Sequence, residues 1–290
     1  MSRIKAPEVD SRWYAFSYLI KSEDDLPADF PIPESTMGFE IGIFLPRDAP
    51  DWFGRSHYPP RVLLLQGGSL LVLTHPHYGV EPVRLELSDL TFCEAGHILL
   101  IGWLRFVTGA LDLHLPYNTR SQRLMNEFLD FLMTVYLGGE ANSWARPTAE
   151  FGPSLDIKFR NYLTSTMRSG EILCARWFSP ASERIRRWGP FRIRREVGGD
   201  LVAYTSERLI WIRDQWDDHY ERYGSITSTA PLRCMEGVHC SGTGERRELN
   251  VGFHSGLSWR IPLFPEAFEE AEAFAAACMS GRRLNQENVS

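Results

Sequence analysis

Two segments of the chain share one pattern of apolar and polar positions. In residues 61–74 (RVLLLQGGSLLVLT), two apolar runs flank a Gly-Gly-Ser turn, which is typical of a β-hairpin. Residues 200–213 (DLVAYTSERLIWIR) repeat this plan with Thr-Ser-Glu at the turn, and Leu70 corresponds to Leu209 without a gap. The pattern therefore predicts two equivalent hairpins and an internal duplication.

A second pair of matching segments lies further along each copy. Residues 108–116 (TGALDLHLP) correspond to residues 255–262 (SGLSWRIP), and both runs end in a proline, Pro116 and Pro262. Apolar residues alternate with other residues in both runs, which predicts a strand. The second copy carries extra residues in the loops between its two matches.

An amphipathic helix is predicted after each of these strands, because the apolar period changes there from two residues to about 3.6. Asn118 or Thr119 is a plausible N-cap for the first helix, and Pro265 suits the first turn of the second because its missing N–H costs nothing there. The predicted buried face of the first helix consists of Leu124, Phe128, Leu132 and Val135. The predicted buried face of the second consists of Phe268, Ala271, Ala275 and Cys278.

The predicted fold class is β with α additions. A run of short antiparallel strands followed by one helix buries its apolar surface most simply as an open barrel whose end the C-terminal helix closes. This order of strands, hairpins and helix resembles the pleckstrin-homology-like (PH-like) superfold, in particular bacterial PH-like and GRAM-like domains. A lipocalin-like barrel is the competing interpretation, but it requires eight long strands in one unit.

The resemblance implies two tandem PH-like domains, at residues 37–138 and 169–281. Residues 139–168 are predicted to be a linker and a connecting helix that docks the two barrels against each other, since a Gly- and Pro-rich stretch precedes helical spacing that ends at Gly170. Residues 1–36 are an N-terminal extension, and residues 282–290 a tail.

The composition favours a folded cytoplasmic protein. Hydrophobic residues make up 43% of the chain, and the net charge of −6 argues against a general nucleic-acid binder. The longest apolar stretch, residues 97–115, is interrupted by Arg105, Gly109 and Asp112, so it predicts two strands and a turn and not a membrane span. The chain starts without a signal-peptide pattern, and its five cysteines show no metal-ligand spacing, so free thiols are expected.

An arginine-rich hairpin at residues 183–196 is the first candidate site. In PH domains that bind phosphoinositides, basic residues of the first two strands hold the phosphates, and this segment occupies the matching place, although it lacks the lysine that begins the family pattern. Arginine suits phosphate because its donors form a planar fork. The alternative is a solvated hairpin with its arginines facing outward. The candidate headgroup-binding residues are Arg184, Arg186, Arg187, Trp188, Arg192, Arg194 and Arg195.

An enlarged loop at residues 211–225 is the second candidate site. It mixes aromatic residues with charged ones, and this composition is common in protein-binding surfaces. The alternative is that these aromatic residues cover the open end of the barrel. The candidate protein-binding residues are Trp216, His219, Tyr220 and Tyr223.

No catalytic, metal or cofactor site is predicted. His75 and His77 supply at most two metal ligands, so a loop after the hairpin is the preferred interpretation. His239 and Cys240 in residues 237–245 (GVHCSGTGE) suggest a Cys-His nucleophile, but neighbouring residues of a strand diverge, and an ordinary hairpin loop explains the segment. Hydrolase, Walker and dinucleotide-binding motifs are absent from the sequence.

The leading functional hypothesis is a non-enzymatic binding or assembly module. PH-like domains offer a barrel edge, a helix face and loops to a protein partner, and a second copy of the chain is the simplest partner. Two alternatives stay open: peripheral binding to an anionic membrane surface through the arginine-rich hairpin, and an enzyme with a site in the interdomain cleft. No cofactor is expected.

Overall fold

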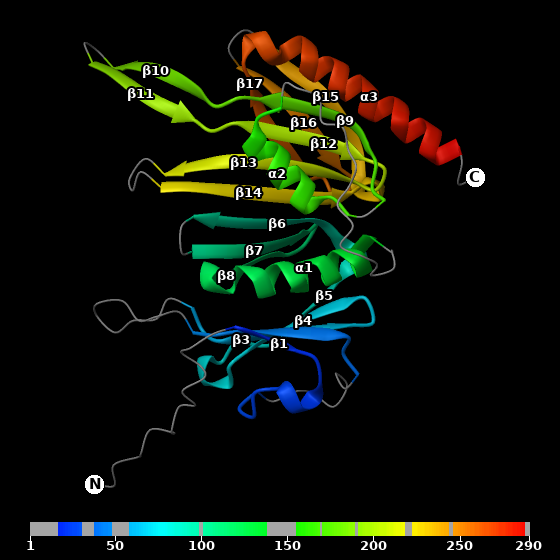
Figure 1. Cartoon of the computed structure of the whole chain (residues 1–290). Helices are drawn as coiled ribbons and strands as arrows, with labels where there is room; N and C mark the ends of the chain where they lie inside the picture. The colour runs from blue at the N-terminus through cyan, green and yellow to red at the C-terminus, as the bar shows by residue number, and fades with distance from the viewer. Residues whose placement is uncertain are drawn as a thin grey trace. The chain divides into compact units, whose positions relative to one another are not determined.

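The fold is taken from a computed structural model of the whole chain (Figure 1). The structure describes residues 17–30, 38–47, 58–98, 101–137, 155–168, 170–188, 191–217, 222–243 and 246–287. Antiparallel strands dominate these residues and a few helices are added to them, which confirms the predicted class of β with α additions. Among the described strands, none of the four sheets closes on itself.

The elements follow one another in the order of the sequence. The strands of the first half are β1 (Tyr18–Ile20), β2 (Ile41–Leu45), β3 (Arg61–Gln66), β4 (Ser69–Thr74), β5 (Val83–Glu86), β6 (Leu90–Ile98), β7 (Ile101–Thr108) and β8 (Asp112–Asn118). Those of the second half are β9 (Leu173–Ser179), β10 (Ser182–Trp188), β11 (Phe191–Val197), β12 (Asp200–Thr205), β13 (Arg208–Asp217), β14 (Arg222–Pro231), β15 (Met235–Thr243), β16 (Arg246–Phe253) and β17 (Ser258–Leu263). The α-helices are α1 (Gln122–Leu137), α2 (Ile157–Thr166) and α3 (Phe268–Glu287).

The same succession of elements occurs twice in the described chain. A strand, a hairpin and a further strand lead through a short 3-10 turn (η5, Leu87–Asp89; η7, Leu232–Cys234) to three more strands, another 3-10 turn and an α-helix. The second copy has the additional hairpin β10–β11 after its first strand, and the first copy has an additional 3-10 turn, Pro76–Tyr78, before β5. The registers agree as well, because Leu65 pairs with Leu70 in β3 and β4 as Tyr204 pairs with Leu209 in β12 and β13. The two hairpins predicted from the sequence are therefore confirmed as equivalent strand pairs.

The strands form sheets that do not follow the two halves of the chain. One five-stranded sheet has the order β1-β2-β3-β4-β5, and one seven-stranded sheet has the order β8-β7-β6-β14-β13-β12-β9. β6 of the first half pairs antiparallel with β14 of the second, from Ile98 opposite Gly224 to Cys93 opposite Thr229. The remaining sheets are β15-β16-β17 and the hairpin β10-β11.

The chain divides into two compact units, each with its own core. The first unit comprises Met1–Leu90, Leu100–Gly102 and Leu115–Ala141. The second comprises Thr91–Leu99, Trp103–His114 and Asn142–Ser290. Most of β6 and β7 thus belongs to the second unit, although the sequence places these strands in the first half.

The core of the first unit lies on the five-stranded sheet. Phe30, Phe44 and Leu64 are buried together on one face, and α1 contacts β1 and β2. Phe128 and Leu132 of the predicted helix face are buried, whereas Leu124 and Val135 are only half-buried, because Met125 and Tyr136 take the positions facing the interior. Asn118 accepts a hydrogen bond from the backbone of Arg120 at the start of this segment, as an N-cap does.

The core of the second unit is rich in aromatic residues. Phe253 of β16 packs against Trp259 of β17 with ring centroids 5.1 Å apart, and Phe92 of β6 packs against the same Trp259 at 5.7 Å. α3 covers β15, and its Ala271, Ala275 and Cys278 are buried as predicted, whereas Phe268 is only half-buried. A strand of the first half therefore contributes to this core through Phe92.

The connecting helix α2 packs on strands of the second half. Phe159 and Leu163 are buried among apolar residues of β12 and β13, and Phe159 contacts Phe178 of β9 at 5.1 Å between ring centroids. Lys158 forms an ion pair of 2.6 Å with Asp214 of β13. Gly170 follows the helix with a φ of 80°, a left-handed conformation that glycine adopts without strain.

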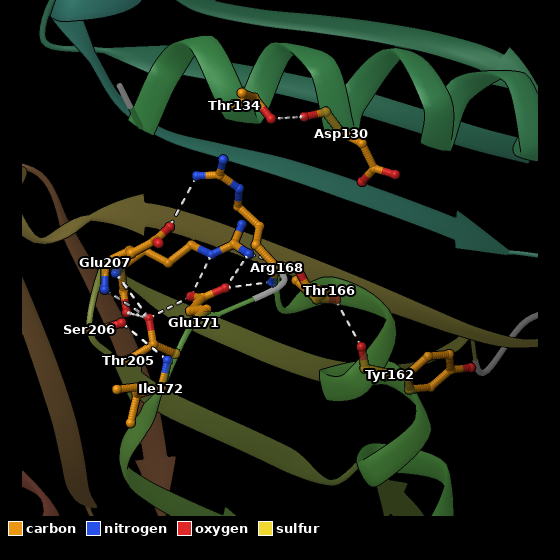
Figure 2. A network of polar contacts seen from close by, with 11 residues as sticks. Asp130, Thr134, Tyr162, Thr166, Arg168, Glu171, Ile172, Thr205, Ser206 and Glu207 are labelled. Carbon is orange, nitrogen blue, oxygen red and sulfur yellow. Dashed lines mark hydrogen bonds and ion pairs between the residues drawn. The ribbon is translucent and has the colours of Figure 1, made fainter. Parts of the chain in front are cut away.

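A buried ion pair lies between the end of α2 and the β12–β13 turn (Figure 2). The guanidinium of Arg208 donates to both carboxylate oxygens of Glu171, at 2.9 and 2.7 Å, and both side chains are almost fully buried. Glu171 also accepts from the Thr205 hydroxyl at 2.6 Å, and Arg208 donates to the carbonyl oxygen of Thr166 at 2.7 Å. The network therefore ties α2 to the hairpin that the sequence repeats.

Two segments interpreted as enlarged loops are strands in the structure. Residues 211–225 belong largely to β13 and β14, which remain paired out to Asp217 opposite Arg222. Within residues 237–245, β15 extends to Thr243 and pairs with β16. The loop interpretations are wrong because the extra residues lengthen hairpins whose backbone hydrogen bonds continue beyond the matching segments.

No described helix is long and apolar enough to cross a membrane.

Candidate functional site

A groove in the second unit collects charged and aromatic side chains from β6, β7, β13 and β17. It has a volume of about 510 Å³, within the range of ligand pockets. Its wall and floor include Phe92, Glu94, Arg105, Trp211, Arg213 and Trp259. We call it the tryptophan groove.

Strand register brings the polar groups of the groove into one row. Trp211 of β13 lies opposite Ser228 of β14, and Ser228 lies opposite Glu94 of β6. Arg213 follows Trp211 by two residues and therefore points to the same face of the sheet. Pairing of β14 with β6 thus places a carboxylate from the first half of the sequence beside an arginine from the second.

Glu94 is a buried carboxylate that accepts from three side chains. Arg213 Nη2 lies 2.7 Å and Ser228 Oγ 3.1 Å from Glu94 Oε2. The indole N–H of Trp103 donates to Glu94 Oε1 at 3.4 Å. A buried charge with this many partners is held in one position, because leaving it unpaired would cost several kcal/mol.

The aromatic floor of the groove leaves two N–H groups without partners. The Arg213 guanidinium stacks 4.3 Å from the ring centroid of Trp211, and Trp211 packs beside Trp259 at 5.8 Å. Arg213 Nε and Trp259 Nε1 are both buried, and neither has a hydrogen-bond partner among the described residues. Both atoms are hydrogen-bond donors.

The rim of the groove carries a second ion pair across the β7–β8 hairpin. Arg105 Nε and Nη2 lie 2.8 and 2.7 Å from the two carboxylate oxygens of Asp112, in a bidentate arrangement. Hydrogen bonds from Arg105 lower the pKa of the Asp112 carboxyl below its ordinary value, and they raise the pKa of Arg105. Both groups are therefore held in their charged forms at neutral pH.

The tryptophan groove thus combines two ion pairs with an aromatic floor. No family model, curated protein or solved structure matches the chain. Ionised carboxylates, guanidinium groups and indole rings offer charge, hydrogen-bond donors and apolar contact to a bound molecule.

Asp200 of β12 lies opposite Arg213 in the strand register, on the face of the sheet that carries Trp211. Its Oδ1 accepts a hydrogen bond of 2.8 Å from the indole N–H of Trp211. Burial raises the pKa of Asp200 from 3.8 to about 6, and the hydrogen bond from Trp211 and the charge of Arg213 only partly oppose this rise. The nearby Asp214 carboxylate also raises this pKa.

Replacing Asp200 with asparagine is expected to change how stability depends on pH. The folded protein holds this proton more tightly than the unfolded chain does, so Asp200 costs stability above its folded pKa, and the cost disappears as the pH falls toward the unfolded value. The asparagine side chain keeps an oxygen for Trp211 but carries no charge. Asp200→Asn should therefore be more stable than the wild type at about pH 8, with a smaller difference at about pH 5 in urea unfolding. An equal difference at both pH values would contradict the assignment.

The arginine-rich segment forms a hairpin, as predicted. β10 and β11 extend from the sheet as a two-stranded ribbon (Figure 1), with Arg184 opposite Arg195 and Arg187 opposite Arg192. Trp188 lies opposite Phe191 at the end of the ribbon. The side chains of the candidate residues Arg184, Arg186, Arg187, Trp188, Arg192, Arg194 and Arg195 lie outside the described part of the structure. Headgroup binding stays a prediction.

The second predicted site falls at the tip of the β13–β14 hairpin. Trp216 lies opposite Tyr223 in the strand register, while His219 and Tyr220 lie outside the described residues. Protein binding by these residues stays a prediction. None of the candidate binding residues of the two predicted sites lines the tryptophan groove, although Trp211 and Arg213, at the start of the 211–225 segment, do.

Of the histidines and cysteines considered in the sequence, His75 precedes a 3-10 turn, and His239 and Cys240 lie on a strand. His75 is buried, and its ring accepts a hydrogen bond from the backbone of His77 at the start of a 3-10 turn. His239 and Cys240 lie on β15, where consecutive side chains point to opposite faces. Within the described residues, no group of three or more histidines, cysteines and acids is arranged to hold a metal.

Some groove residues could be recognised in the sequence as charged residues within apolar stretches. Arg105, Gly109 and Asp112 interrupt the longest apolar stretch, and all three line the groove. Glu94 similarly stands alone in the apolar strand LTFCEAGHI. Lone charges in a strand that is otherwise buried indicate a partner elsewhere in the fold, but they do not identify it.

Proposed function

We propose that the chain is a non-enzymatic binding module built from two PH-like repeats, and that the tryptophan groove is its recognition surface for a protein segment. The repeated succession of elements supports the PH-like assignment, because each copy has a run of antiparallel strands and ends in a helix. The groove carries the functional part of the proposal. It joins tryptophan side chains to arginine side chains, and both residue types are enriched in protein interfaces.

The state of the charged groups favours binding over acid–base catalysis. Arg105 and Asp112 are paired with each other, as are Arg213 and Glu94. A general acid or base is most effective with a pKa near the operating pH, whereas Arg105 lowers the pKa of Asp112 away from neutrality. These groups can orient a bound partner without exchanging protons.

Selection of peptides from an unbiased display library tests the proposal. The wild type should enrich peptides that bind about tenfold or more weakly to Ser258→Trp, because Ser258 is exposed at the groove and an indole there would fill it. Arg123→Trp, at an exposed position on α1, is the control and should bind the same peptides as the wild type. Failure to enrich peptides, or enrichment that Ser258→Trp leaves unchanged, would contradict the proposed function.

A second candidate function is attachment to an anionic membrane surface through β10–β11. The paired ribbon favours it, because its register brings the backbones of Arg184 and Arg195, and of Arg187 and Arg192, directly opposite each other. Each arginine near an anionic surface contributes about 1 kcal/mol of attraction. Vesicles with anionic lipid should then bind the protein at low salt and lose it when Arg192 and Arg194 are replaced by glutamate.

A further inference from the structure

The tryptophan groove has more hydrogen-bond donors than acceptors for them. Its buried polar atoms without a partner are Arg213 Nε and Trp259 Nε1, and both are donors. Its carboxylates have no such deficit, because Glu94 accepts from three side chains and Asp112 accepts two bonds from Arg105. An acceptor brought to these two buried donors would satisfy groups that the described residues leave unpaired.

The charged side chains that line the groove also favour a partner with acceptor groups. Three guanidinium groups (Arg105, Arg213 and Arg260) line it against two carboxylates (Glu94 and Asp112). The Arg260 side chain is exposed on β17, and it forms no hydrogen bond or ion pair with a described residue. The lining therefore has one guanidinium group more than it has carboxylates.

We propose that the tryptophan groove binds an acidic peptide segment whose carboxylate pairs with Arg260 and whose backbone or side-chain oxygens accept from Arg213 and Trp259. This inference rests on the proposed function and names the chemistry of its partner. The arginines of the groove already bind carboxylates within the chain, in the bidentate pair of Arg105 and Asp112.

The aromatic lining favours a peptide over inorganic phosphate or a lipid headgroup. Trp211, Trp259 and Phe92 present apolar surface beside the donors, and a phosphate ion has no apolar part to place against them. An acidic peptide with apolar neighbours supplies both kinds of contact. The apolar residues Leu111 and Leu257 extend the same lining toward the rim.

Fluorescence anisotropy with defined peptides tests the inference. The probes are a fluorescein-labelled peptide of alternating glutamate and leucine and the matched glutamine and lysine peptides. The glutamate peptide should bind wild type at least about tenfold more tightly than either matched peptide, the difference expected from one charge-assisted hydrogen bond. Added salt should weaken its binding.

Two groove variants and one control locate the binding. Arg260→Gln should weaken binding of the glutamate peptide about tenfold, so that its affinity becomes similar to that of the glutamine peptide. Trp259→Phe keeps an aromatic ring but removes the N–H, and it should weaken the binding of both peptides. Arg123→Gln, which removes an exposed arginine from α1, should leave both affinities unchanged.

The outcomes separate the inference from the function on which it rests. Equal binding of the glutamate and glutamine peptides, with loss in Ser258→Trp, would overturn the acidic specificity and leave the groove as a peptide site. Displacement of the glutamate peptide by inorganic phosphate at equal concentration would assign the site to phosphate and overturn the inference. Binding of the glutamate peptide that neither Arg260→Gln nor Ser258→Trp changes would place the peptide outside the groove.

Discussion

Replacing Arg208 with methionine should lower the free energy of unfolding by about 3–5 kcal/mol. The substitution leaves the Glu171 carboxylate with no guanidinium partner at a position where its side chain is fully buried. Thr205 and the backbone N–H of Arg168 remain as its donors, which is too little to replace a bidentate cation. Urea unfolding followed by tryptophan fluorescence measures the loss.

An exposed arginine–glutamate pair provides the matched control. Arg84 and Glu86 form an ion pair of 3.0 Å with both side chains about half exposed, so Arg84→Met should cost less than about 1 kcal/mol. The double variant Glu171→Leu/Arg208→Met should recover most of the loss, since it removes the buried charge along with its partner. A cost for Arg208→Met as small as that for Arg84→Met would show that the buried network does not stabilise the fold.

The buried pair of Glu171 and Arg208 should make the free energy of unfolding depend on pH in the acidic range. Burial raises the pKa of the Glu171 carboxyl, but the hydrogen bonds and charge of Arg208 and the hydrogen bonds from Thr205 and the Arg168 backbone together outweigh burial and lower it below the ordinary 4.5. Because the folded pKa is lowered, the stabilisation is present above the unfolded value and is lost as the pH falls through the folded one. The wild type should therefore lose its advantage over Glu171→Leu/Arg208→Met in acid.

Replacing Gly224 with valine should destabilise the protein by about 2–3 kcal/mol and loosen the junction between the two halves of the sequence. A side chain at Gly224 would overlap the carbonyl oxygen of His97 on β6 and crowd Ile98, where β14 pairs with β6. The carbonyl belongs to a strand held on both sides, so it cannot move aside without breaking the ladder. Hydrogen exchange should show faster exchange in β6 than in the wild type.

A second strand glycine serves as the control for that variant. Gly252 on β16 has no atom closer than 3.7 Å to the position of an added Cβ, so Gly252→Ala fits without a clash. It should leave stability unchanged or slightly higher, since alanine restricts the unfolded chain. A tolerated Gly224→Val with unchanged exchange in β6 would contradict the β6–β14 pairing.

The β6–β14 pairing also explains how the tryptophan groove arises. Glu94 comes from β6, while Trp211 and Arg213 come from β13, and only β14 between them sets their spacing. Damage to this pairing is therefore expected to remove the groove along with the junction. The glutamate peptide should bind Gly224→Val more weakly than it binds Gly252→Ala.

Local patterns in the sequence were enough to predict the repeat and its elements. The hairpins at residues 61–74 and 200–213, the strands before Pro116 and Pro262, and the helices that follow are all present, because each depends on periodicity and turn chemistry within a few residues. The correspondence extends into the helices, where Phe128 and Phe274 are both buried at matching distances from these prolines. Arginine alternation likewise predicted the β10–β11 hairpin.

Only the tertiary structure decided which strands lie side by side across the two halves. The sequence marks β6 and β14 as strands, but the backbone hydrogen bonds that join their edges are the same for any pair of strands and leave no trace in the side-chain pattern. The isolated charged residues Glu94 and Arg105 indicated that each has an oppositely charged partner. Strand pairing places Arg213 beside Glu94, and the register of the β7–β8 hairpin places Asp112 beside Arg105. The groove is therefore a property of long-range strand pairing, whereas the repeated elements that build it are properties of the local sequence.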